Sequence, residues 1–251
     1  MTLQGRTAVV TGGGRGIGRA IALGLAAEGA TVAVLARTEN QLDAVVAEAK
    51  ELGGDGIAIP VDAMDGPALK RAVAEAHPGG TLDILVNNVG GLLGDSAGLA
   101  ALDHDDDLFE QNIRLNLTSA YYATRAALPL MVAGGYGRII TIGSGYATHG
   151  GGPISYSAAK HGLVGLTRAL AYQVPAGITV NCLCPGWTNT DVLGWSGPDG
   201  PAQAAAKAAV HTVQGRIIEP EELVPMAVLL ASPAGAAITG QVISVDGGFK
   251  V

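Results

Sequence analysis

Tyr156 and Lys160 are two residues whose types and spacing could do proton chemistry. They stand four positions apart in the segment ISYSAAK, residues 154–160. Residues four apart lie over one another on one face of an α-helix, so the phenol and the ammonium can meet if this segment is helical. A phenol ordinarily holds its proton until about pH 10, and a fixed cation beside it brings the exchange towards neutral pH. Two unrelated helix neighbours would show the same spacing, so the surrounding sequence has to decide.

A second chemical signal is a glycine-rich turn near the N-terminus. The stretch VVTGGGRGIG, residues 9–18, places Gly12, Gly16 and Gly18 between an expected strand and an expected helix. Glycines let the backbone approach a ligand closely, and the start of the following helix offers N–H groups and the positive end of a dipole. The spacing differs from the usual Gly-x-Gly-x-x-Gly, but the position after the first strand indicates a turn that binds nucleotide phosphates.

The elements that must position these residues alternate between short apolar strands and longer Ala/Leu-rich helices. Strands that are apolar throughout must be covered on both faces, so we predict an α/β fold with a Rossmann-like, doubly wound parallel sheet of about seven strands. The expected strands are 6–11, 31–36, 56–61, 82–87, 137–143, 177–183 and 241–246, and the expected helices are 16–29, 39–51, 66–77, about 105–133, 154–173 and 220–231.

No linker or tandem repeat interrupts this alternation, which predicts one domain over residues 1–251. The segment 187–214 differs from the rest, because it combines Gly/Pro clusters, two tryptophans and an Ala-rich piece. Ligands in such folds bind beyond the carboxyl ends of the strands, so this segment is expected to form a substrate lid. A plain surface loop is the alternative.

Composition limits the partners that the chain can take. An apolar fraction of 48% over 251 residues is enough for a large buried core. The net charge of −7 argues against a nucleic-acid surface, because such a surface needs concentrated positive charge. The uncharged stretch 225–245 is interrupted by Pro and Gly residues, so it predicts a helix, a turn and a strand, and no membrane span.

Compartment and metal content are also constrained. The N-terminus has no basic segment leading into an apolar run, so we expect no export signal and a cytoplasmic protein. The two cysteines, Cys182 and Cys184, fit a reduced compartment and cannot close a zinc site alone. The acidic run DHDDD at 103–107 is favoured at the start of a helix by the helix dipole, and no metal is expected there.

Further motifs follow the glycine turn in order. NNVG follows the fourth expected strand at 87–90, and Asn116 stands in IRLNLTSAY. Ser144 ends IITIGS, the Tyr-Lys pair comes next, and PGWTNT follows the sixth strand at 185–190. Six motifs in this order resemble the short-chain dehydrogenase/reductase family from end to end, which identifies the tyrosine and lysine as an acid and the cation that tunes it.

The resemblance implies an oxidoreductase that transfers a hydride between a nicotinamide and a ketone or secondary alcohol. Tyr156 would be the general acid/base, and Lys160 would tune it while binding the nicotinamide ribose hydroxyls. Ser144 would bond the substrate carbonyl oxygen, and Asn116 would hold a water that links Lys160 to solvent. The positions that match the family's cofactor contacts are Gly12, Arg15, Gly16, Ile17, Gly18, Arg37, Asp62, Asn88, Tyr156, Lys160, Pro185, Gly186, Thr188 and Thr190.

Ser144 lies one residue closer to Tyr156 than is common in the family. The loop between them, GYATHGGGP at 145–153, is therefore expected to be shortened and to reshape the substrate site. Outside the catalytic set, the candidate walls of that site are Tyr146, His149, Trp187 and Trp195.

The residues after the second expected strand predict the cofactor. Ala36 stands where an NAD-preferring member has a carboxylate for the adenosine ribose, and Arg37 follows it. An arginine gives a forked, charge-assisted contact to phosphate, and Arg15 could reach the same phosphate. Asp62 resembles the residue that binds the adenine amino group. We therefore expect NADP(H), with solvated surface arginines as the alternative.

Three functions are consistent with these motifs. The first is an NADP(H)-dependent reductase of a small or medium ketone. The second is a 3-oxoacyl-[acyl-carrier-protein] reductase, and charge tells against it, because the segments 131–137 and 169–175 lack basic residues that would dock an acidic carrier. Arg125, Arg138 and Arg168 remain available. The third is a non-catalytic dinucleotide-binding sensor, which would not need to keep the proton donor.

The resemblance also implies a homo-oligomer, either a dimer or a homotetramer. The apolar segments 120–131 and 238–249 fit such contacts. The remaining expected partner is a small-molecule carbonyl substrate.

Overall fold

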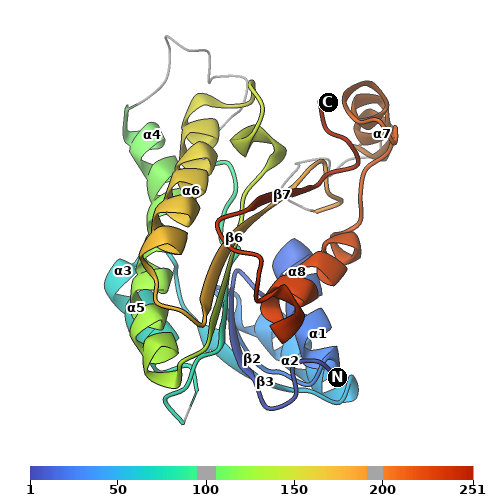
Figure 1. The fold of residues 1–251 in the computed structure, drawn as a ribbon. Coiled ribbons are helices and arrows are strands. Elements are labelled where there is room, and N and C mark those ends of the chain that lie inside the picture. The colour runs from blue at the N-terminus through green and yellow to red at the C-terminus, as the bar shows by residue number, and fades with distance from the viewer. Residues whose placement is uncertain (78, 95–105, 191–199, 251) are drawn as a thin grey trace.

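The computed structural model describes residues 1–77, 79–94, 106–190 and 200–250, which contain one seven-stranded parallel sheet (Figure 1). The strands are β1 Thr7–Thr11, β2 Thr31–Ala36, β3 Asp55–Pro60, β4 Ile84–Asn87, β5 Gly137–Ile142, β6 Ile178–Pro185 and β7 Val242–Val245. Their order in the sheet is β3-β2-β1-β4-β5-β6-β7. The order reverses between β1 and β4, which is the position where open α/β sheets bind ligands. The predicted fold class is confirmed.

Helices cover both faces of the sheet. In Figure 1, α3, α4, α5 and α6 lie on one side, and α1, α2 and α8 lie on the other. A further helix, α7, stands beside the C-terminal end of the chain. The bounds are α1 Gly16–Ala27, α2 Glu39–Glu51, α3 Gly66–Ala74, α4 Asp106–Ile113, α5 Ser119–Gly134, α6 Ile154–Gln173, α7 Gly200–His211 and α8 Val224–Ala231.

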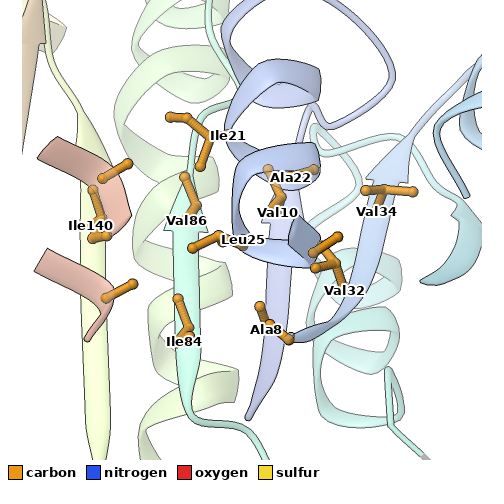
Figure 2. Packing of buried hydrophobic residues seen from close by; sticks show 14 of the residues in the cluster. Ala8, Val10, Ile21, Ala22, Leu25, Val32, Val34, Ile84, Val86 and Ile140 are labelled. Carbon is orange, nitrogen blue, oxygen red and sulfur yellow. The ribbon is translucent and has the colours of Figure 1, made fainter. Parts of the chain in front are cut away.

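Two apolar clusters hold the layers together. Successive side chains of a strand point to opposite faces, so Val10 of β1 joins the cluster under α1, whereas Val9 joins the cluster under α3 and α5. Figure 2 shows the first cluster, in which Ile21 and Leu25 of α1 lie over the strands. Ile21 and Leu25 are both fully buried, and burying a side chain of this size stabilises the folded state by about 1.5–3 kcal/mol relative to leaving it exposed. This packing fixes where the strands end and therefore where the loops that follow them begin.

The long helix expected over about 105–133 is interrupted. A π-helical turn, Arg114–Thr118, separates α4 from α5, and the Ser119 N–H bonds the Arg114 carbonyl oxygen five residues back. The Ser119 hydroxyl donates to the Leu115 carbonyl oxygen at 2.6 Å, which satisfies a group displaced by the wider turn. Such turns are frequent at functional sites.

Within the described residues, no helix has the length and apolar character needed to cross a bilayer. The same residues contain no group of three or more His, Cys, Asp or Glu side chains that could hold a metal ion.

Candidate active site

A cavity of about 710 Å³ opens at the carboxyl ends of the strands. It is lined by the turn after β1 and by residues at or just after the ends of β2, β3, β4, β5 and β6. The predicted residues that line it are Gly12, Arg15, Gly16, Ile17, Arg37, Asp62, Asn88, Ser144, Tyr156, Lys160, Pro185, Gly186, Thr188 and Thr190. Gly18 and Asn116 lie behind this lining. One cavity therefore brings the expected catalytic pair and the expected cofactor residues together.

The glycine turn combines left-handed glycines with an uncapped helix start. Gly12 and Gly16 adopt left-handed backbone at φ 65° and 54°, which other residues rarely reach. A Cβ added at Gly18 would lie 2.3 Å from the Gly12 carbonyl oxygen, so Gly18 allows the turn to pack against α1. The first turn of α1 has no acidic residue and no side-chain cap. Backbone, helix dipole and charge thus all fit the phosphates of a dinucleotide.

Asn88, which follows β4, binds this turn through three hydrogen bonds. Its Nδ2 donates to the carbonyl oxygens of Thr11 and Gly12, both at 3.1 Å, and its backbone N–H donates to the Thr11 hydroxyl at 3.1 Å. Sequence reasoning missed Thr11, although its place directly before Gly12 was a usable signal. Thr11 and Asn88 together hold the glycine turn against the end of β4.

The expected catalytic side chains meet around the end of β5 and the start of α6. Lys160 is only 3% exposed, and its ammonium donates to the Ile142 carbonyl oxygen at 2.9 Å. Lys160 Nζ lies 5.5 Å from the centre of the Tyr156 ring. Ser144 lines the same cavity, and its hydroxyl oxygen accepts the Tyr146 N–H at 3.2 Å. A phenol, a buried cation and a hydroxyl donor therefore face one space.

Asn116 is placed one layer behind this group. It is fully buried within the π-helical turn, where its Oδ1 accepts the Gly91 N–H at 3.0 Å and its Nδ2 donates to the Gly91 carbonyl oxygen at 2.8 Å. A Cβ added at Gly90 would lie 2.8 Å from Asn116 Oδ1 and 3.1 Å from Lys160 Nζ. Asn116 and Lys160 therefore flank Gly90, where a Cβ would force the Asn116 side chain to shift.

Asn112 repeats this arrangement one turn earlier, and sequence reasoning missed it. It is fully buried, its Oδ1 accepts the Leu93 N–H at 3.0 Å, and its Nδ2 donates to the Leu93 carbonyl oxygen at 3.2 Å. The two asparagines thus bind the backbone of residues 91–93 as a neighbouring strand would. Gly91, Leu92 and Leu93 all line the cavity.

The other end of the cavity is formed by the residues after β2 and β3. Ala36, Arg37 and Thr38 line it, and Arg37 is exposed. Thr38 precedes α2 without capping it, so its hydroxyl is a further polar group at this end that the sequence analysis missed. Asp62 lines the cavity as well, and its Oδ1 accepts the Met64 N–H at 2.9 Å.

The candidate substrate walls lie partly in view. Tyr146 and His149 both contact Phe249 edge-on, with ring centres 5.4 and 6.0 Å apart. Trp187 stacks on His211 of α7 at 6.1 Å. Trp195, like residues 191–199 of the expected lid and residues 103–105 of the acidic run, lies outside the described residues.

Comparison with known proteins agrees with this geometry. Residues 12–250 match the protein family described as Enoyl-(Acyl carrier protein) reductase. The chain is 36% identical over 252 residues to the 3-oxoacyl-[acyl-carrier-protein] reductase FabG of Escherichia coli (strain K12), with 99% of each chain covered.

Two solved structures are similar over nearly their whole length. A putative NAD(P) dependent gluconate 5-dehydrogenase from Beutenbergia cavernae with bound NADP is 38% identical, with a TM-score of 0.88 and 98% of this chain and 97% of that chain covered. A 3-oxoacyl (acyl-carrier-protein) reductase from Agrobacterium tumefaciens C58 with NADP bound is 32% identical, with a TM-score of 0.90 and 98% and 95% covered.

Fold, cavity and relatives together define an oxidoreductase built on a Rossmann-like sheet. The chain belongs to the short-chain dehydrogenase/reductase family, as its six motifs predict.

Proposed function

We propose that the protein is an NADP(H)-dependent carbonyl reductase in which Tyr156 exchanges the proton with the substrate oxygen. The observation that carries this proposal is the position of the buried Lys160 ammonium. Its Nζ lies 5.5 Å from the centre of the Tyr156 ring, and both residues line the cavity that Ser144 also lines. Among the described residues no carboxylate pairs with Lys160, so its charge is available to the phenol and to ribose hydroxyls.

When bound, NADPH supplies a hydride, so that a ketone, NADPH and a proton give a secondary alcohol and NADP⁺. Ser144 donates its hydroxyl hydrogen to the carbonyl oxygen and stabilises the charge that develops there. Tyr156 gives its proton to the same oxygen, and Lys160 stabilises the phenolate left behind. Asn116 acts behind them, by fixing the Gly91 backbone beside Lys160.

Support for NADP(H) comes from the distal end of the cavity. Ala36 offers no carboxylate to the adenosine ribose, and Arg37 and Thr38 supply a cation and a hydroxyl next to it. The Beutenbergia and Agrobacterium relatives were both determined with NADP. A 2′-phosphate placed between these groups would gain charge-assisted hydrogen bonds that NADH cannot make.

The test of the proton transfer is Tyr156→Phe, which removes one oxygen and keeps the ring. Since general acid catalysis contributes about 10²- to 10⁴-fold, kcat should fall by at least about a hundredfold. The dissociation constant of NADPH, followed by nucleotide fluorescence, should change by less than about threefold. Tyr172→Phe is the matched control, because Tyr172 lies on the same helix and is 93% exposed. Unchanged turnover in Tyr156→Phe contradicts the mechanism.

A second candidate is the 3-oxoacyl-[acyl-carrier-protein] reductase, favoured by full-length similarity to the Escherichia coli enzyme. Carrier docking requires exposed basic residues, and Arg138 is only 3% exposed. It stacks on Tyr136 at 4.1 Å and donates to the Gly177 carbonyl oxygen, which leaves Arg125 and Arg168 on the surface. Steady-state kinetics decide: a much higher kcat/KM for the carrier-bound substrate than for its free thioester analogue favours the second candidate.

A further inference from the structure

The C-terminal segment folds back onto the loop that follows Ser144. The Phe249 side chain is 2% exposed and packs edge-on against Tyr146. A Cβ added at Gly145 would lie 2.4 Å from the Phe249 ring, so the loop and the C-terminal segment are in direct contact. A hydrogen bond from Lys250 to the Gly150 carbonyl oxygen adds a contact between residues 100 positions apart in sequence.

Lys250 has a backbone conformation that needs an explanation. Among the described residues it is the only non-glycine with positive φ, at 50°. A side chain in this region costs about 1 kcal/mol relative to glycine. The Lys250 N–H donates to the His211 carbonyl oxygen at 3.0 Å, which helps to hold the conformation.

The Lys250 ammonium contacts the loop 145–153, which follows Ser144. Its Nζ donates to the Gly150 carbonyl oxygen at 2.8 Å and lies 5.2 Å from the centre of the Tyr146 ring. A Cβ added at Gly151 would lie 2.8 Å from this Nζ, so the glycine makes room for it. An ammonium has three hydrogens, and the Gly150 bond uses one. No described carboxylate forms an ion pair with Lys250.

Tyr146 connects this cation to the reacting groups. The Tyr146 backbone N–H donates to the hydroxyl oxygen of Ser144, two residues earlier in the chain. Ser144 is the residue proposed to donate to the substrate carbonyl oxygen. Burial raises the pKa of the Tyr146 phenol, and the Tyr156 phenol raises it further. The Lys250 cation therefore lies against the loop that joins Ser144 to the helix of Tyr156, in a protein whose net charge is −7.

We propose that Lys250 is a specificity residue that binds a carboxylate on the substrate, so that the enzyme prefers oxo acids to the corresponding neutral ketones. This inference rests on the proposed carbonyl reduction and names its substrate class. An ammonium-carboxylate contact near a protein surface strengthens binding in a salt-dependent way. A charge-assisted hydrogen bond corresponds to about tenfold in affinity.

The test compares acids with their methyl esters under NADPH. The probes are 3-oxobutanoate, 4-oxopentanoate and 5-oxohexanoate, each beside its ester, because the series varies the distance between ketone and carboxylate. For at least one pair, we expect wild-type kcat/KM to favour the acid by about tenfold at low salt, and less at high salt. Lys250→Met should reduce the acid-to-ester ratio about tenfold.

Two further variants separate charge from folding. Lys250→Gly removes the ammonium while accepting the left-handed backbone, so it should lower the ratio as Lys250→Met does. Lys70→Met is the matched control, because Lys70 on α3 also lies over a tyrosine, Tyr122, at 5.3 Å and carries the same charge. It should leave the ratio unchanged.

The outcomes distinguish the inference from the function on which it rests. A wild-type preference for acids that both Lys250 variants lose supports the proposal. Equal use of acids and esters by the wild type, a preference for esters, or a ratio that survives both Lys250 variants overturns it and leaves ketone reduction standing. Absence of turnover with every ketone and both cofactors overturns the proposed function and this inference together.

Discussion

Ala36 and Arg37 are the residues at which single side chains should decide the cofactor. The double variant Ala36→Asp/Arg37→Ile replaces a cation with a carboxylate that accepts ribose hydroxyls and repels a 2′-phosphate. We expect the proposed preference for NADPH to reverse by about tenfold or more, mainly through the KM for cofactor. Initial rates with both cofactors at saturating substrate measure this.

The control at this scale is Lys50→Ile, which removes a cation from the far end of α2. It should leave the ratio of the two KM values unchanged. Wild-type protein that binds NADH as tightly as NADPH at low salt, where a phosphate-arginine contact is strongest, contradicts the roles given to Arg15 and Arg37.

At the scale of elements, the segment after β4 is held by a helix and not by another strand. Asn112 and Asn116 lie one turn apart at the junction of α4 and the π-helical turn, and each bonds both backbone groups of one residue, Leu93 or Gly91. A buried amide that satisfies a backbone N–H and a carbonyl replaces the missing ladder hydrogen bonds. This arrangement is why 91–93 can form a cavity wall.

Asn112→Leu tests this element. The variant has similar volume but leaves the Leu93 N–H and carbonyl without partners, so we expect about 1–3 kcal/mol less stability. Because Leu92 and Leu93 line the cavity, the KM for NADPH should rise while the Tyr156 chemistry itself is intact. Gln111→Leu, at the exposed neighbouring position, is the control. Urea unfolding and cofactor titration of both variants measure the effects, and equal behaviour of the two contradicts the role of Asn112.

Sequence reasoning predicted the elements well because their signals are local. Each expected strand was a run of apolar residues, and each overlaps a strand of the sheet. The motifs of the cavity also stand on short segments, so most predicted residues line it. The roles of those residues, the single domain, the oligomer and the cytoplasmic location stay predictions.

Features that depend on distant partners were not predictable. The π-helical turn contains Asn116, whose contact partner Gly91 lies 25 positions away in the sequence. The sequence around Lys250 indicates only a surface lysine, because the residue that it contacts, Gly150, lies 100 positions away. No periodicity or motif carries such information.

At the scale of the whole molecule, His77 links folding to pH. It is 6% exposed, and its Nε2 lies 3.0 Å from the Ala8 carbonyl oxygen of β1. Burial lowers the pKa of His77 below its ordinary value of 6.5, and the bond to Ala8 and the charge of Asp83 offset this only in part. The folded protein therefore disfavours the imidazolium, whereas the unfolded chain accepts the proton freely.

The sign of the resulting pH dependence follows from linkage. Below pH 6.5 the unfolded state binds more protons at His77 than the folded state, so the contribution of the neutral histidine is fully present above pH 6.5 and is lost as pH falls towards the folded pKa. One group gives a slope of at most about 1.4 kcal/mol per pH unit. The Arg216 guanidinium and the Glu219 N–H lower the pKa of Glu222 from 4.5 to about 2. Protonation of that carboxylate therefore changes the stability only at more acidic pH than the range in which His77 titrates.

Thermal unfolding between pH 7.5 and 5, at fixed protein concentration, isolates the histidine. We expect the melting temperature of the wild type to fall as pH drops through this range, and His77→Gln, which keeps a donor for the Ala8 carbonyl, to show a flatter profile even if its stability at pH 7.5 is lower. His161→Gln, which removes an exposed histidine from α6, should keep the wild-type slope. If His77→Gln and the wild type lose stability in parallel, the pH dependence arises elsewhere, and the buried imidazole is only a packing residue.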